Sequence, residues 1–340
     1  MEPMMTDNPL LSDPRPWCIG RFVIDRPTHS EVSYEKYEFW GDKINIINNV
    51  SLGTFQHKAS EREDELRKKR RTILIPYKES VKRGLPNGVL ETDASWLEKV
   101  LSPTQNSRLF IFKEDGESDA SFSADGYVLA GTTMLTMKSS VADDGVQKFI
   151  DLTTAEYQSI TYRENWTVPA ERGFCINGAL IGGPSRNSEV AEQTISMIPG
   201  KPSLFVIKMR DAVEADRKFS LLKTLPDLRN DLKERGYSHN VRVLREGNRQ
   251  VAGMDAEEVL LSIKDGETQV FQFYLQAPGN PDTTAQPHTE IQLLLGDELS
   301  DADKDSGMKP EDMSSPVDEA GAIQAWDTLL NSMRLRPGAM

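Results

Sequence analysis

The sequence lacks any run of about 20 apolar residues, which is the length that a helix needs to cross the hydrocarbon core of a membrane. It also lacks a visible export signal, because residues 1–16 are polar and rich in proline and contain no apolar segment. We therefore expect residues 1–16 to form a flexible tail, and we expect no membrane span. Two locations stay open: the protein remains in the cytoplasm, or this sequence lacks its leader.

The sequence has no excess of basic residues. It contains 40 lysines and arginines against 53 aspartates and glutamates, which gives a net charge of −13. Both halves are acidic: residues 1–170 hold 21 basic against 26 acidic residues, a net −5, and residues 171–340 hold 19 against 27, a net −8. Nucleic acid is therefore excluded as an expected partner, because binding to phosphates needs a basic surface.

No pattern typical of catalysis or of cofactor binding is complete. Gly183-Pro184-Ser185-Arg186-Asn187 departs from the Gly-x-Ser-x-Gly motif of serine hydrolases, because asparagine replaces the second glycine. Residues 301–307 resemble a calcium loop, but Ser306 takes the place of its glycine. The four histidines are not spaced as metal ligands and are expected on the surface or in loops: His29, His57, His239 and His288. We predict no catalytic residue, metal or cofactor, and a flexible acidic loop over residues 297–315.

Ten residues occur twice in the chain. Cys18–Pro27 and Cys175–Pro184 share the cysteine, two isoleucines and the proline, and Ser-Glu-Val follows each copy. Each copy is typical of an apolar strand that ends at a proline, because proline cannot donate to a sheet. The repeat predicts two domains of related fold, residues 17–167 and residues 168–340, although a chance similarity of two strands stays open.

The sequence contains only two cysteines, Cys18 and Cys175, one in each copy of the repeat. If the two domains pack about a pseudo-twofold axis, their equivalent strands bring the two sulfur atoms together. A bridge that closes so long a loop contributes about 2–4 kcal/mol, provided that the Cα atoms lie within roughly 7 Å. The alternative is a pair of buried free thiols, which are common in protein cores. A disulfide between Cys18 and Cys175 is thus one of two possibilities.

Strand patterns occur in groups, with helices between the groups rather than in strict alternation. This predicts an α+β fold of two related domains, each a mostly antiparallel β-sheet with helices packed on one face. The clearest helix follows Ser315, the expected N-cap, with Pro316 in its first turn and Trp326 on its apolar face. The other predicted helices cover residues 61–71, 147–162 and 213–235.

Four motifs together resemble one protein family. They are Cys18-x-Gly20-Arg21-Phe22-x-Ile24-Asp25-x-Pro27, Pro169…Gly173-Phe174-Cys175-Ile176, Arg249-x-Val251-Ala252-Gly253-Met254-x-x-Glu257-Glu258, and Trp326-Asp327…Arg334-Leu335-Arg336-Pro337-Gly338-Ala339. These motifs span residues 17–339, nearly the whole chain. In them the sequence resembles the bacterial type VI secretion immunity proteins that neutralise class-four lipase effectors.

The resemblance implies a two-domain inhibitor without enzymatic activity. Its N-terminal immunity domain would be residues 17–167 and its C-terminal immunity domain residues 168–340. The two domains would grip a phospholipase effector, the expected partner, and block its access to lipid without any cofactor. Such proteins act in the periplasm, where the lipase arrives. A second hypothesis is an enzyme, a hydrolase or transferase whose site is assembled from scattered residues.

Overall fold

The computed structural model describes residues 8–74, 77–84, 89–114, 121–234 and 239–340. The chain divides into two compact units. The first unit comprises residues 1–41, 165–176 and 184–340, and the second comprises residues 42–164 and 177–183. The chain therefore passes from the first unit to the second and back twice. One crossing, after Glu164, is close to the expected boundary, and the division into residues 17–167 and 168–340 stays a prediction.

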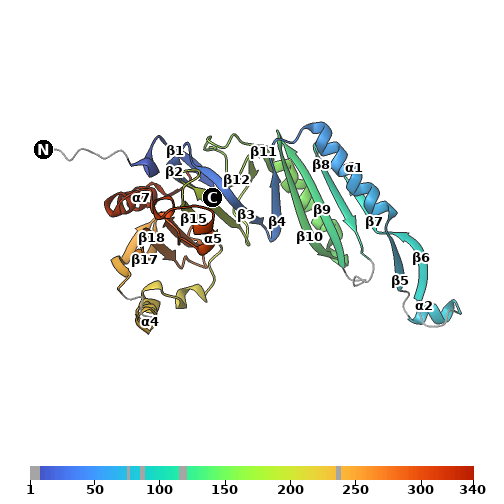
Figure 1. Cartoon of the computed structure of the whole chain (residues 1–340). Coiled ribbons are helices and arrows are strands. Elements are labelled where there is room, and N and C mark those ends of the chain that lie inside the picture. Colours follow the sequence, from blue (N-terminus) through green and yellow to red (C-terminus); the bar gives the residue numbers. More distant parts are fainter. Residues whose placement is uncertain (1–7, 75–76, 85–88, 115–120, 235–238) are drawn as a thin grey trace. The chain divides into compact units, whose positions relative to one another are not determined.

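An antiparallel sheet forms the centre of the first unit, with the strand order β16-β17-β18-β19-β15-β14-β3 (Figure 1). Its strands are β3 (Glu31–Phe39), β14 (Val190–Ser196), β15 (Ser203–Arg210), β16 (Val241–Val251), β17 (Met254–Asp265), β18 (Thr268–Ala277) and β19 (His288–Leu295). Phe271, Phe273 and Leu275 of β18 are buried, whereas the residues between them are half-buried. Such alternation is typical of a sheet with one face in a core and the other partly in water.

The buried face of this sheet packs against α7 (Glu319–Ser332) and a small sheet. The ring of Trp326 on α7 meets the ring of Phe273 edge-on, with 5.9 Å between centroids. The small sheet has the order β1-β2-β20 and consists of β1 (Pro14–Ile19), β2 (Phe22–Pro27) and β20 (Arg334–Leu335). Trp17 of β1 donates from Nε1 to Gln193 on β14 at 2.9 Å. The core of the first unit therefore lies between these elements and the large sheet.

The start of the chain is more ordered than expected in the part that the structure describes. Pro9–Leu11 forms a 3-10 helix, η1, whose N-cap Asn8 accepts a hydrogen bond from Leu10 N. Leu10 is completely buried, and Asn8 donates to the carbonyl of Gly321 on α7 at 2.9 Å. The prediction of a flexible tail over residues 1–16 is therefore wrong for residues 8–16, because an apolar side chain and an amide hold them against α7. Residues 1–7 lie outside the described residues.

Each copy of the repeat contains a turn. Cys18–Pro27 runs from β1 through a turn into β2, with Gly20 at a φ of +56°. Cys175–Pro184 runs from β12 (Gly173–Ile176) through Asn177-Gly178 into β13 (Ala179–Gly182), with Gly178 at +76°. Glycine has no Cβ and adopts a positive φ without steric cost. The prediction of one apolar strand per copy is therefore wrong, and Asn-Gly is the turn signal that we overlooked.

The second unit also centres on an antiparallel sheet, with the order β4-β10-β9-β8-β7 (Figure 1). Its strands are β4 (Asp42–Ile47), β7 (Leu97–Leu101), β8 (Ser107–Phe112), β9 (Ser121–Ala130) and β10 (Thr133–Ala142). Further elements of this unit are α2 (Tyr77–Lys82), η3 (Asp143–Gly145), the pair β5 (Arg70–Leu74) and β6 (Val89–Ser95), and β11 (Ile160–Tyr162), which pairs with β13.

Helices lie on both faces of each sheet, and not on one face as expected. In the second unit, α1 (Leu52–Lys68) packs against Phe110 and Tyr127, whereas Tyr157 of α3 (Val146–Ser159) approaches Gly126, on the opposite face of β9. In the first unit, α4 (Leu221–Glu234) covers the face opposite α7. Both sheets carry apolar residues on both faces, so both need cover. The predicted α+β class with two domains and mostly antiparallel sheets is confirmed.

Several helix boundaries differ from the predictions because other residues act as caps. Ser51 accepts a hydrogen bond from Thr54 N at 3.1 Å, so α1 begins well before residue 61. Asp318, and not Ser315, is the N-cap of α7. The predicted helix 213–235 consists of η4 (Asp216–Lys218) and α4, and its predicted end lies outside the described residues. The predicted acidic loop contains α5 (Asp301–Asp305) and α6 (Pro310–Met313). Within the described chain, no helix is long and apolar enough to cross a membrane.

Candidate functional site

One face of the first unit's sheet is only partly covered, and we call it the open face. It is the face that carries α4 at β16 and β17, whereas β18, β19, β15, β14 and β3 present mostly half-buried or exposed residues there, with Val206 of β15 as a buried exception. The register places one row of residues across these strands: Tyr274, Gln292, Val206, Thr194 and Tyr34. Tyr34 at the end of this row is 50% exposed. Tyrosines and amides on an accessible sheet are typical of a protein-binding surface.

The next row on the open face alternates in charge. The register aligns Glu290, Lys208, Glu192 and Lys36 across four neighbouring strands. Lys208 lies 3.5 Å from Glu192, and Lys36 lies 3.1 Å from Glu38. Opposite charges on facing strands stabilise a sheet modestly, by about 0.2–1 kcal/mol for each pair. The two lysines of this row therefore each lie beside a carboxylate, whereas Glu290 at its end contacts only His288 among the described ionisable side chains.

A buried aspartate fixes the segment that follows β15. Asp216 accepts two hydrogen bonds from Arg210, at 2.7 and 2.8 Å, and one from Val213 N at 2.8 Å. The hydrogen bonds from Arg210 hold the pKa of Asp216 below its usual value. His288 lies beside this pair and contacts Glu290 at 3.1 Å, which lowers the pKa of Glu290. The segment between β15 and α4 is thus pinned to β15 and β19.

Phe219 stands on this pinned segment with 53% of its surface exposed. It lines two hollows. The first, of about 530 Å³, lies between the start of α4 and the strands β16–β18, and its lining includes Lys223, Asp255 and Glu257. The second, of about 380 Å³, lies over β18 and β19, and its lining includes Tyr274 and Glu290. We call them the α4 hollow and the β19 hollow.

The start of α4 is held on the sheet by polar and apolar contacts. Glu257 on β17 accepts hydrogen bonds from Ser220 Oγ, at 2.8 and 2.9 Å, and from Leu222 N at 3.0 Å. A carboxylate at this place compensates the free N–H groups of the first helical turn. Leu225 then packs against Val259 and Leu261 of the sheet. The walls of the α4 hollow are therefore anchored on the sheet.

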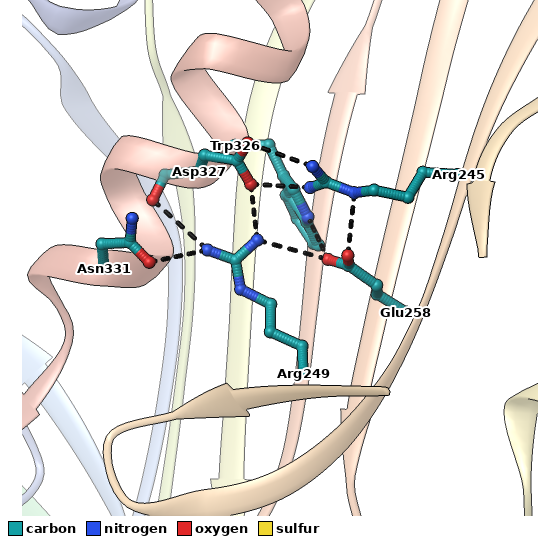
Figure 2. Close-up of polar contacts among 6 residues, drawn as sticks. All are labelled: Arg245, Arg249, Glu258, Trp326, Asp327 and Asn331. Carbon is teal, nitrogen blue, oxygen red and sulfur yellow. Dashed lines mark hydrogen bonds and ion pairs between the residues drawn. The ribbon is translucent and has the colours of Figure 1, made fainter. Parts of the chain in front are cut away.

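On the opposite, covered face, an ionic network joins α7 to β16 and β17 (Figure 2). Asp327 of α7 accepts from Arg245 at 2.6 and 3.1 Å and from Arg249 at 2.5 Å. Glu258 accepts from Trp326 Nε1 at 2.8 Å and lies 2.8 Å from Nε of Arg245. Burial raises the pKa of Asp327, but the hydrogen bonds from Arg245 and Arg249 outweigh it, so that this pKa lies below its usual value.

The two cysteines lie together in the first unit. The sulfur atoms of Cys18 and Cys175 lie 2.05 Å apart and the Cα atoms 5.9 Å apart, which is geometry that suits a disulfide. Next to them, Gly20 and Cys175 exchange two backbone hydrogen bonds, at 2.9 and 2.7 Å. Arg336, which is 1% exposed, donates to the carbonyls of Pro169, Glu171 and Gly173 at 2.6–2.7 Å. The segment 165–176 is therefore held in place by hydrogen bonds from Gly20 and Arg336.

The other candidate residues from the sequence do not come together with one another. Ser185 accepts a hydrogen bond from Thr284 at 2.7 Å. His57 is exposed beside Glu61, whereas His288 is only 5% exposed, so the expectation of a surface or loop position was wrong for His288. Asp301–Asp305 is helical and capped by Ser300, and among the described residues no group of three histidine, cysteine, aspartate or glutamate side chains is placed to hold a metal ion.

Sequence reasoning missed the open face. Phe219 lies in the predicted helix 213–235, where an apolar residue suggests core packing. Asp216, which is bound to Arg210, begins the 3-10 turn ahead of α4, and Phe219 is the exposed residue that follows this turn. Arg249, Glu258 and Asp327 belong to the motifs that resemble the family, and the structure places them in the ionic network between α7 and the sheet.

Comparisons with known proteins agree with the architecture. The N-terminal domain model of Tle cognate immunity protein 4 matches residues 15–163, and the C-terminal domain model matches residues 167–338. A comparison with curated proteins finds no match.

Solved structures share the fold over almost the whole chain. The crystal structure of a Tle4-Tli4 complex aligns with 97% of this chain and 99% of that chain, at a TM-score of 0.77 and 20% identity. The apo structure of the immunity protein TplEi of the T6SS from Pseudomonas aeruginosa aligns with 96% and 98%, at 0.75 and 19% identity. The same protein in complex with an "L" peptide aligns with 96% and 99%, at 0.72 and 19% identity. Because the two domain models together match nearly all of the sequence, this chain belongs to the Tle cognate immunity protein 4 family.

Proposed function

We propose that this protein is a type VI secretion immunity protein that binds a cognate phospholipase effector and blocks the access of lipid to it. The observation that carries the proposal is the match of both family domains, in order, over residues 15–163 and 167–338. A relative of the same fold is described as a Tle4-Tli4 complex, and another as a T6SS immunity protein. These descriptions belong to the relatives, and they support a protein partner for this chain.

The inhibition needs binding and no chemistry. A lipase acts only when lipid reaches its buried nucleophile, so a protein that covers or clamps the entrance stops hydrolysis. We propose that both domains contact the effector, as the family resemblance implies. The first unit suits this role because its open face offers tyrosines and amides on a sheet that α7 supports from behind. We further propose that the protein has no enzymatic activity of its own.

A titration of lipase activity tests the proposal. The effector encoded beside this gene is assayed on phospholipid vesicles with rising amounts of the purified protein. We expect activity to fall linearly to zero at an equimolar ratio, because tight binding is stoichiometric. Full activity at a several-fold molar excess contradicts the immunity function. Hydrolysis by this protein alone would favour the alternative, a hydrolase or transferase.

We also propose that the protein works in the periplasm with Cys18 and Cys175 bridged. The proximity of the two sulfur atoms supports this, since disulfides persist in oxidising compartments. Thiol labelling of unfolded, unreduced protein from a periplasmic fraction gives the readout. We expect no labelling before reduction and two labelled thiols per chain after it. Two reactive thiols before reduction would exclude the bridge, and recovery of the protein only from the cytoplasm would exclude the location.

A further inference from the structure

Phe219 combines high exposure with a fixed position. Its backbone segment is bound through Asp216 to Arg210, and Ser220 directly after it is bound to Glu257. A large aromatic side chain that is 53% exposed on such a segment costs little further ordering when a partner covers it. Residues of this kind carry much of the energy in protein interfaces when a pocket of the partner encloses them.

The α4 hollow beside Phe219 has carboxylates without cationic partners. Within the described chain, neither Asp255 nor Glu257 has a lysine, arginine or histidine nitrogen within 4 Å. Lys223 likewise has no carboxylate oxygen of the described residues within 4 Å. The other two cations of the lining are already compensated: Arg217 by Glu214 at 3.0 Å, and Arg249 by the network beneath α7. The pairing inside the protein therefore leaves one negative charge in excess.

The β19 hollow has the same excess. Arg210 is compensated by Asp216, so Glu290 remains, with His288 as its closest cationic candidate. Within the described residues, Glu290 therefore has no lysine or arginine nitrogen within 4 Å. Both hollows therefore suit a cationic side chain, and they lie on either side of one exposed aromatic ring.

We propose that Phe219 and these two hollows form the anchor of the effector interface, with Phe219 entering an apolar pocket of the effector and basic side chains of the effector entering the hollows over Glu257 and Glu290. The inference rests on the proposed function and specifies its chemistry: the contacted effector surface is basic around an apolar pocket. The open face beside the anchor then forms the remainder of the contact.

Affinity for the effector encoded beside this gene tests the anchor, with an inactive nucleophile variant of the effector in the binding assay. We expect Phe219→Ala to raise Kd by about 30-fold or more, the loss typical of a hot spot. Tyr162→Ala, which truncates an equally exposed aromatic residue outside the anchor, is the control and should change Kd by less than about threefold, because interface residues outside a hot spot contribute little to the binding energy. Both variants should keep the thermal midpoint of the wild type, because both side chains are exposed.

Charge reversal tests the basic nature of the partner. Asp255→Lys places a cation at the exposed rim of the α4 hollow, and we expect it to lower the association rate and to weaken its dependence on salt. Asp301→Lys makes the same charge change on an aspartate that is 97% exposed on α5, and should leave the rate within about twofold. Tighter binding of Asp255→Lys would show an acidic partner surface and would contradict the inference that the effector surface around the pocket is basic.

The outcomes separate the inference from the proposed function. If the wild type binds the effector and Phe219→Ala binds equally well, the anchor is wrong and the immunity function stands. If the wild type itself does not bind, the proposed function fails first.

Discussion

The two faces of the first unit's sheet both carry arginine, lysine and carboxylate side chains, but in different surroundings. On the face beneath α7, the side chains of Glu258 and Arg249 are 7% and 13% exposed. On the open face, those of Lys208 and Lys36 are each 43% exposed. Glu258 and Arg249 have lost most of their water and depend on pairing within the protein, whereas Arg245 and Asp327 at the edge of the network are each 35% exposed and the open-face lysines remain partly hydrated.

This difference assigns the two faces different roles. The covered network makes the position of α7 depend on charge pairing, because an unpaired buried charge is costly. The stability of the fold depends little on the ion pairs of the open face, so the side chains there can lose bound water and contact a partner. The family motifs follow the same division: Arg249, Glu258 and Asp327 belong to motifs and lie beneath α7, whereas Phe219 and Lys208 lie in none of them.

The largest effect should come from breaking the covered network at Glu258. Glu258→Gln removes the charge that Arg245 and Arg249 share and weakens the acceptor of Trp326 Nε1. We expect a loss of about 3 kcal/mol in the free energy of unfolding, because two arginines lose a buried partner. Urea unfolding at pH 7 measures it.

Glu246→Gln provides the matched control. Glu246 lies on β16 and pairs with Arg229, but both side chains are more than 40% exposed. We expect a change below about 0.5 kcal/mol. Equal losses in the two variants would contradict the distinction between covered and open ion pairs.

A smaller effect should appear in the acid dependence of stability. The pKa of Asp327 lies below its value of about 3.9 in the unfolded chain. Its contribution is therefore fully present above about pH 4 and is lost as the pH falls through the folded-state pKa. Asp327→Asn should be less stable than the wild type at pH 7, and the difference should shrink below pH 4. Urea unfolding between pH 7 and pH 2.5 measures both, and a constant difference would contradict the assignment.

The smallest effect should come from the open face. Lys208→Ala removes the central cation of the charged row and its contact with Glu192. We expect at most about 0.5 kcal/mol of destabilisation, and less in 0.5 M salt, because exposed pairs are hydrated and screened. Thermal unfolding at low and high salt gives the comparison with Glu258→Gln. A loss as large as that of Glu258→Gln would remove the contrast between the faces.

Local patterns were sufficient for part of the fold. The grouping of the strand patterns predicted mostly antiparallel sheets, and the apolar face around Trp326 predicted the last helix. Caps were harder: Ser315 and Asp318 are both good N-caps, but Ser315 donates from Oγ to the carbonyl of Val317, and Asp318 accepts from Gly321 N. Each copy of the repeat was interpreted as one strand because it is apolar and ends at a proline, although Gly20 and Gly178 reverse the chain within each copy.

The spacing of residues within short segments was enough to predict the α+β class and the antiparallel sheets, and the motifs were enough to predict the family. Which charges are buried and which are exposed became known only from the folded chain. Arg249 of β16 and Asp327 of α7 are 78 residues apart and form a hydrogen bond, while Phe219, an ordinary apolar residue in the sequence, is exposed on a segment that the pair of Arg210 and Asp216 fixes to the sheet. Burial is a property of neighbours brought together by folding, and the spacing of residues along one segment does not contain it.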